Sequence, residues 1–77
     1  MDKVRRRKIL NSIDDLYEIL DNLRNYSFRE DEARKKIPLS RKYEDERTES
    51  ENVSDALDKA IEAIKDAISY LREVEDY

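Results

Sequence analysis

The pattern that decides the fold lies in residues 53–74, which read VSDALDKAIEAIKDAISYLREV. Apolar residues recur there in alternating steps of four and three, the spacing of one stripe along an α-helix. The stripe consists of Val53, Leu57, Ala60, Ile64, Ala67, Leu71 and Val74, with Ala56, Ile61, Ala63, Ile68 and Tyr70 beside it. Because small alanines allow close approach, the pattern predicts a helix that packs against a second helix.

The start of this helix is marked by Thr48-Glu49-Ser50-Glu51, which has the form of a capping box. In such a box the threonine hydroxyl accepts a hydrogen bond from the amide three residues on, and the glutamate reaches back to the threonine amide. Ser54 is a later alternative cap. We therefore expect a helix over about residues 49–75.

A second stripe, with the same alternating steps, runs through Ile9, Ile13, Leu16, Leu20 and Leu23. It is flanked by Leu10, Tyr17, Ile19 and Tyr26. The following stretch, residues 28–37, has acidic residues first and basic residues last, as the helix dipole favours. Glu30 interrupts the stripe, and Ala33 and Ile37 resume it after a one-residue slip. We expect one helix over about residues 3–36 that continues with a bend; a restart at the capping box of Ser27 and Glu30 is the alternative.

Pro38 ends this first helix, because proline cannot donate a helix hydrogen bond and disfavours helical geometry in the residue before it. A loop is expected over about residues 38–47. A dense basic patch, Lys3, Arg5, Arg6, Arg7 and Lys8, opens the sequence, and acidic residues such as Glu73, Glu75 and Asp76 close it. Folding the chain back on itself pairs these two ends, so the charge pattern favours an all-α antiparallel helical hairpin in a single domain, residues 1–77.

The composition excludes most catalytic and metal chemistry. The chain has 77 residues, a net charge of −4, and no Gly, Cys, His or Trp. Phosphate-binding loops need glycine, thiolate sites need cysteine, and activated serines usually need histidine. No apolar run approaches the length of a membrane span, and no signal peptide is recognisable. We expect a cytoplasmic protein that is not an enzyme and has no cofactor, no bound metal and no membrane partner.

Two charged groups are candidate binding surfaces. The basic patch could contact phosphate, but the chain is acidic overall and carries no nucleic-acid motif, so we do not expect nucleic-acid binding. The acidic residues of the polar helix sides could imitate the phosphates of DNA and occupy a basic groove on another protein. These residues are Asp14, Asp15, Glu18, Asp21, Asp55, Asp58, Glu62 and Asp66. A solvated helix surface is the simpler interpretation of the same pattern.

The apolar pattern is wider than one helix pair can cover. Two packed helices bury one stripe each, which leaves flanking apolar side chains in water and calls for a further protein surface. The expected interface residues are Leu10, Tyr17, Ile19, Tyr26, Ile61, Ile68 and Tyr70. We expect a homodimer that forms a four-helix bundle, with docking on a different protein as the alternative.

The order of these segments resembles a family. The residues concerned are Arg6-Arg7-Lys8-Ile9, the acidic Glu30-Asp31-Glu32 before Ile37-Pro38, Leu57-Asp58-Lys59-Ala60-Ile61, and Ala67-Ile68-Ser69-Tyr70-Leu71. The chain is in these respects similar to short helical-hairpin proteins of unknown function encoded by bacteriophages and bacterial mobile elements. The resemblance implies such an origin, no catalytic residues, and binding to host machinery. An inhibitor of a host defence or nucleic-acid-binding protein, anti-CRISPR-like or a DNA mimic, is the alternative function.

Overall fold

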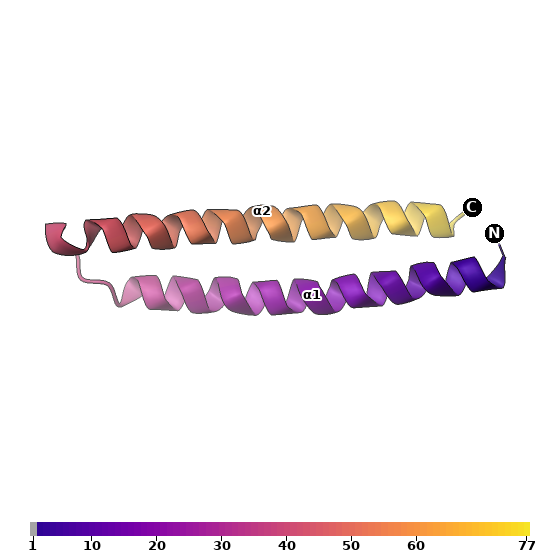
Figure 1. Cartoon of the computed structure of the whole chain (residues 1–77), viewed down its shortest axis with the longest axis horizontal. Coiled ribbons are helices and arrows are strands. Elements are labelled where there is room, and N and C mark those ends of the chain that lie inside the picture. Colours follow the sequence, from indigo (N-terminus) through magenta and orange to yellow (C-terminus); the bar gives the residue numbers. More distant parts are fainter. Residues whose placement is uncertain (1) are drawn as a thin grey trace.

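The computed structural model describes residues 2–77 as an all-α antiparallel hairpin. Helix α1 (Lys3–Lys35) leads through a short 3₁₀ helix, η1 (Arg41–Tyr43), into helix α2 (Glu44–Glu75). The two long helices lie side by side, and both ends of the chain meet at the end opposite the loop (Figure 1). The molecule measures 60 × 15 × 11 Å, so it is a single layer two helices wide. The predicted hairpin is confirmed.

Helix α1 is one uninterrupted helix. At its start Asp2 is the N-cap, and its carboxylate accepts a hydrogen bond from the amide of Arg5 at 2.8 Å. The helix passes through Ser27 without restarting and ends at Lys35, three residues before Pro38. The predicted end at residue 36 is therefore correct to one residue, and continuation was the correct alternative.

Helix α2 begins five residues earlier than predicted, and the predicted capping box is wrong. Thr48 lies inside the helix, which starts at Glu44 directly after η1. Its first turn holds Glu44, Asp45 and Glu46, whose negative charges favour the N-terminal end of a helix dipole. Before it, the amide of Tyr43 donates to the carbonyl of Ser40 at 3.1 Å. The connection between the long helices thus covers residues 36–43.

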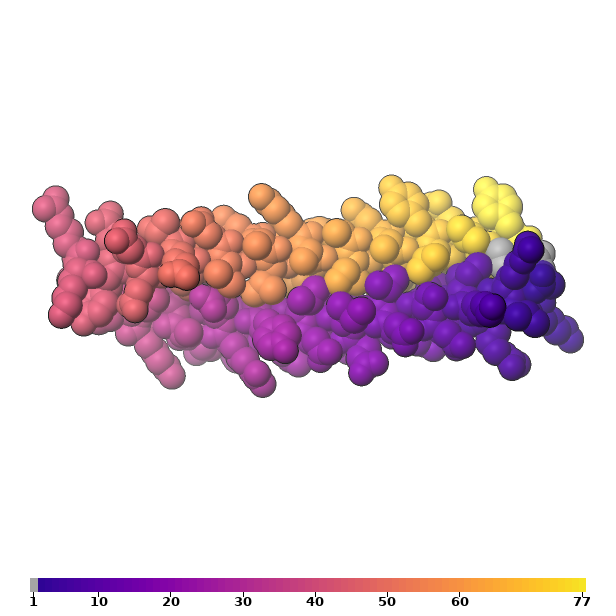
Figure 2. Space-filling view, viewed as in Figure 1, coloured from indigo at the N-terminus to yellow at the C-terminus, as the bar shows by residue number. Residues whose placement is uncertain are grey.

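The seam of the hairpin is the line of contact between α1 and α2, which touch along the length of the molecule (Figure 2). On α1 it follows the predicted stripe: Ile13 and Leu20 are buried, with Ile9 and Leu16 packed around them. On α2 the buried residue is Ile68, and Ile61, Ile64 and Leu71 pack against the same cluster.

The predicted stripe on α2 therefore differs from the seam at four of its seven positions. Leu57, Ile64 and Leu71 do lie in the seam, but Val53 and Val74 are exposed, and Ile61 and Ile68 take the places assigned to Ala60 and Ala67. The physical reason is area: isoleucine has three more carbons than alanine, and each buried methylene contributes about 0.8 kcal/mol. Rotating the helix to bury the isoleucines is the favourable choice.

Nearer the loop the same steps of four and three continue, but the seam residues become polar. On α1 the positions are Ser27, Glu30 and Arg34, all half-buried, and the predicted slip of register onto Ala33 does not occur, because Ala33 is exposed. On α2 they are Arg47, Ser50 and Ser54, of which both serines are buried. The hairpin thus has an apolar half-seam near the chain ends and a polar half-seam near the loop.

Candidate protein-interaction surface

The hairpin has two broad sides, and residues seven apart on a helix lie on the same side of the seam. On one side, the guanidinium of Arg72 on α2 lies over the ring of Tyr17 on α1, 5.4 Å from its centre, and donates a hydrogen bond to its hydroxyl. Asp31 and Glu51 border one cavity on this same side. We call this side the charged face; it comprises Leu10, Tyr17, Arg24 and Asp31 from α1 with Glu51, Asp58, Lys65 and Arg72 from α2.

The opposite side is apolar. Ala33 of α1 and Val53 of α2 line a common cavity there, which shows that their two rows share one side. We call it the apolar face; it comprises Ile19, Tyr26 and Ala33 from α1 with Val53, Ala56, Ala60, Ala63, Ala67, Tyr70 and Val74 from α2. Ile19 is 44% exposed, Tyr26 56% and Tyr70 66%. Ala60 and Ala67 are half-buried at the edge of the seam, and the other side chains of this face are exposed, so the hairpin leaves a strip of apolar surface uncovered.

Helix α2 therefore carries two apolar stripes. The inner one packs on α1 through Ile61, Ile64, Ile68 and Leu71, and half-buried Leu57 continues its spacing toward the loop. The outer one, through Val53, Ala56, Ala60, Ala63, Ala67, Tyr70 and Val74, also alternates steps of three and four and faces outward. The stripe predicted from the sequence combined residues of both. An outer stripe with its own helical spacing is the pattern of a second packing surface.

The seven predicted interface residues fall into three groups. Ile19, Tyr26 and Tyr70 lie on the apolar face and are exposed, as expected of an interface. Leu10 and Tyr17 lie on the charged face, where Arg72 already engages Tyr17. Ile61 and Ile68 were assigned wrongly, because both pack inside the seam and Ile68 is only 4% exposed.

The predicted acidic surface does not form one uniform patch. All eight carboxylates are exposed. Basic side chains lie among them. The ammonium group of Lys65 donates to the carboxylate of Glu62 at 3.3 Å, and Arg72 shares the charged face with Asp58. Across residues 2–77, no group of three or more carboxylates could hold a metal ion. The arrangement is that of a solvated helix surface.

The basic patch is exposed at the open end of the hairpin. The guanidinium of Arg6 donates to the backbone carbonyl of Glu75 at 3.3 Å, and Arg5 pairs with Asp2 at 3.5 Å. The predicted placement of the basic patch beside the acidic end of α2 is confirmed by this contact of Arg6 with Glu75, but the ion pairs found within residues 2–77 join residues three apart on one helix. Exposed pairs contribute at most about 1 kcal/mol, too little to fix long side chains in place.

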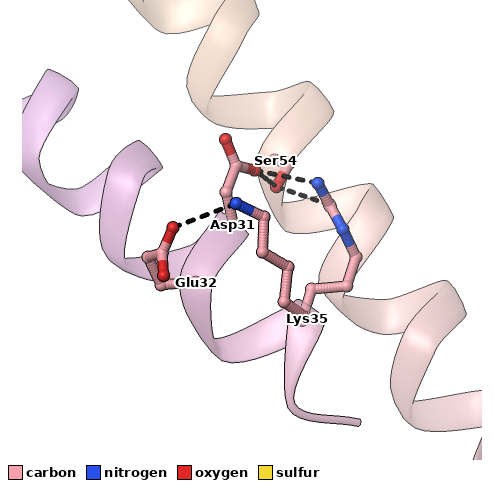
Figure 3. A network of polar contacts seen from close by, with 5 residues as sticks. Asp31, Glu32, Lys35 and Ser54 are labelled. Carbon is pink, nitrogen blue, oxygen red and sulfur yellow. Dashed lines mark hydrogen bonds and ion pairs between the residues drawn. The ribbon is translucent and has the colours of Figure 1, made fainter. Parts of the chain in front are cut away.

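Polar residues of the seam were missed by the sequence interpretation. Arg34 donates to the hydroxyl of Ser54 and to the carboxylate of Asp31, both at 2.9 Å, and Ser54 donates to Asp31 at 3.3 Å. Figure 3 shows Ser54 of α2 beside Asp31 of α1 in this network, next to the ion pair of Lys35 with Glu32. The signal was available, because Ser54 and Arg34 fall on the continued steps of the stripe.

An acidic cavity lies at the loop end of the apolar face. Its volume is about 330 Å³, and its charged lining residues are Glu30 of α1 with Glu46 and Glu49 of α2. No basic residue lines it. Ser50 also lines it; this residue is 6% exposed, and its hydroxyl has no hydrogen-bond partner within residues 2–77. The apolar face thus ends in a negatively charged hollow.

Comparison with known protein families, curated proteins and solved structures finds nothing that matches this chain. Neither long helix of the described chain is apolar enough over its length to cross a membrane. Interpretation of function therefore depends on the two faces and the acidic cavity.

Proposed function

We propose that this protein acts without catalysis, by binding protein through its apolar face, and that a homodimer is the assembly it forms. The exposed strip of Ile19, Tyr26, Tyr70 and the alanines between them is the observation that supports the proposal. Covering a half-exposed isoleucine or tyrosine stabilises a complex by about 1 kcal/mol, at about 25 cal/mol per Å². Several such residues in one strip supply a large part of a micromolar affinity.

The thinness of the molecule supports the same proposal. A hairpin 11 Å thick has one seam and no second layer, and within residues 2–77 its buried apolar core consists of three side chains, Ile13, Leu20 and Ile68. Small domains with so little core are commonly stabilised by oligomerisation. Two hairpins joined by their apolar faces make a four-helix bundle, in which α1 and α2 of each copy are covered on a second side.

The test is the solution mass, measured by light scattering during gel filtration at micromolar concentration. We expect twice the monomer mass, and a monomer for Ile19→Glu and for Tyr70→Glu. Leu10→Glu is the matched control: Leu10 is 40% exposed on the same helix as Ile19, which is 44% exposed, but lies on the charged face.

A monomeric wild-type chain would contradict the homodimer. If the monomer bound another protein, and Ile19→Glu abolished this binding while Leu10→Glu did not, the apolar face would be a docking site for a different protein. Loss of assembly in all three variants would contradict the assignment of function to this face.

A further inference from the structure

We infer that the acidic cavity at the loop end is a receptor for the basic first turn of α1 of a second copy, so that the two hairpins associate with their loops at opposite ends. This inference rests on the proposed homodimer and adds its orientation and a specific site. The ligand class is a guanidinium or ammonium group. The carboxylates concerned are Glu30, Glu46 and Glu49.

The chemistry of the cavity points to an extended organic cation. Three glutamates line it without a basic residue, and the buried hydroxyl of Ser50 has no partner. Unpaired polar groups at a buried site are unfavourable until something bonds to them. A single metal ion does not fit, because the described residues contain no group of three carboxylates able to hold one. A guanidinium has five donors in a plane and can reach carboxylates that are too far apart to share one ion.

The chain carries such cations at its opposite end and on the same face. Arg5 lies seven residues before Ser12, and the same interval leads on to Ile19, Tyr26 and Ala33. Arg5 therefore lies in the same line of residues along α1 as these three residues of the apolar face. Lys8 follows one turn later, and both side chains are exposed. This face of the molecule thus carries Arg5 and Lys8 at the chain ends, apolar side chains in the middle and the acidic cavity at the loop, where Arg29 and Lys36 continue the row of Lys8.

Two apolar faces can be joined about a two-fold axis in two ways. If the axis runs along the molecule, both loops lie at one end, which brings the two acidic cavities to that end and leaves neither of them opposite a basic turn. If the axis runs across it, each cavity lies against the partner's basic turn. Like charges brought together are strongly unfavourable and opposite charges set the register of an interface, so the second arrangement is selected.

The outer stripe of α2 fits the same arrangement. Its residues are nearly symmetrical in position about Ala63, with Ala60 and Ala67 on either side and valines at both ends. Against a reversed copy, bulky Tyr70 falls opposite small Ala56, and the alanines let the two helices approach closely. Beside the stripe, Lys59 falls opposite Asp66 of the second copy. Neither takes part in an ion pair within residues 2–77, so both are available across the axis.

The orientation can be measured with one spin label per chain, because the sequence has no cysteine. Leu39→Cys places the label in the loop, where the side chain is 89% exposed. We expect a label-to-label distance in the dimer close to the 60 Å length of the molecule. As a second reporter, Ala63→Cys should form an intermolecular disulfide under mild oxidation, whereas Ser69→Cys, on the other side of α2, should not.

The site itself is tested by charge reversal. Glu46→Lys with Glu49→Lys should weaken the dimer by about tenfold or more, because the partner's basic turn then meets like charge. Arg5→Glu with Lys8→Glu should do the same, and a chain with all four changes should recover the dimer. Asp14→Lys with Asp55→Lys, an equal charge change away from the apolar face, should leave the dimer unchanged. Circular dichroism verifies that each variant is helical.

The outcomes separate the two proposals. A monomeric wild-type chain overturns both the homodimer and the site. A dimer with a short Leu39 distance, or one that the reversal of Glu46 and Glu49 does not weaken, overturns this inference and leaves the homodimer intact. Weakening by both paired reversals without recovery in the four-change chain also overturns it.

Discussion

The two halves of the seam follow one spacing but differ in chemistry. In the apolar half, Leu20 and Ile68 are buried at 3% and 4% exposure among aliphatic neighbours. In the polar half, Ser50 and Ser54 are buried almost as deeply, at 6% and 7%, beside the charged groups of Arg34 and Asp31. Burial of aliphatic carbon stabilises directly, whereas buried polar groups at best recover the hydrogen bonds they had with water. The comparison locates the stability of the hairpin near its chain ends.

The largest expected effect tests the apolar half. Leu20→Ala removes the most buried apolar side chain of the seam and should destabilise the protein by about 3 kcal/mol, from lost transfer energy and the cavity left behind. The measurement is urea denaturation followed by circular dichroism at one fixed protein concentration. Leu10→Ala, at an exposed position on the same helix, is the control and should change stability by less than about 0.5 kcal/mol.

Hydrogen exchange compares the halves within one molecule. Amides around Ile13–Leu20 and Ile61–Ile68 should need global unfolding to exchange, while those of residues 27–35 and 44–54 should exchange through local opening. We expect at least a tenfold difference in protection, about 1.4 kcal/mol in opening free energy. Uniform protection along both helices would show that the polar half-seam is as stable as the apolar half.

Much of the fold behind this comparison could be predicted from the sequence, and the features that could not be predicted have physical causes. The helices, the hairpin and the α1 stripe follow from periodicity and Pro38, because those signals are local. The rotation of α2 could not be predicted, because Leu57, Ile64 and Leu71 fit both the predicted stripe and the inner stripe, and only packing against α1 selects Ile61 and Ile68 over the alanines. The acidic cavity was beyond prediction, since Glu30 and Glu46 meet only through the register of the two helices.

Two buried serines test how much hydrogen bonding contributes to the stability of the polar half. Ser54 is bonded to Arg34 and Asp31, whereas the hydroxyl of Ser50, four residues earlier, has no partner within the described chain. In the Tyr70→Glu background, which is expected to be monomeric, Ser50→Ala should stabilise the protein by about 1 kcal/mol, because it removes a buried hydroxyl that is unpaired in the single chain. Ser54→Ala should destabilise it by a similar amount, because it leaves Arg34 and Asp31 short of a partner.

The gain in helix propensity on changing serine to alanine is common to both variants and cancels in their difference. Thermal denaturation of the two variants in parallel gives that difference directly. Equal shifts would show that the hydroxyl of Ser50 finds a partner in solution, for example a water molecule.

The smallest expected effect concerns the edge of the apolar half, where Arg72 bonds to the hydroxyl of Tyr17 across the charged face. Tyr17→Phe removes this bond but keeps the ring under the guanidinium, so the contact of the cation with the ring survives. The expected loss is about 0.5 kcal/mol, since a partly exposed hydrogen bond exchanges with water at little net cost. Tyr43→Phe is the control, because Tyr43 lies outside the apolar face, its hydroxyl takes part in no side-chain hydrogen bond among residues 2–77, and no change in stability is expected. A loss above about 2 kcal/mol for Tyr17→Phe would mean that polar contacts also stabilise the apolar half, and the contrast between the two halves would no longer hold.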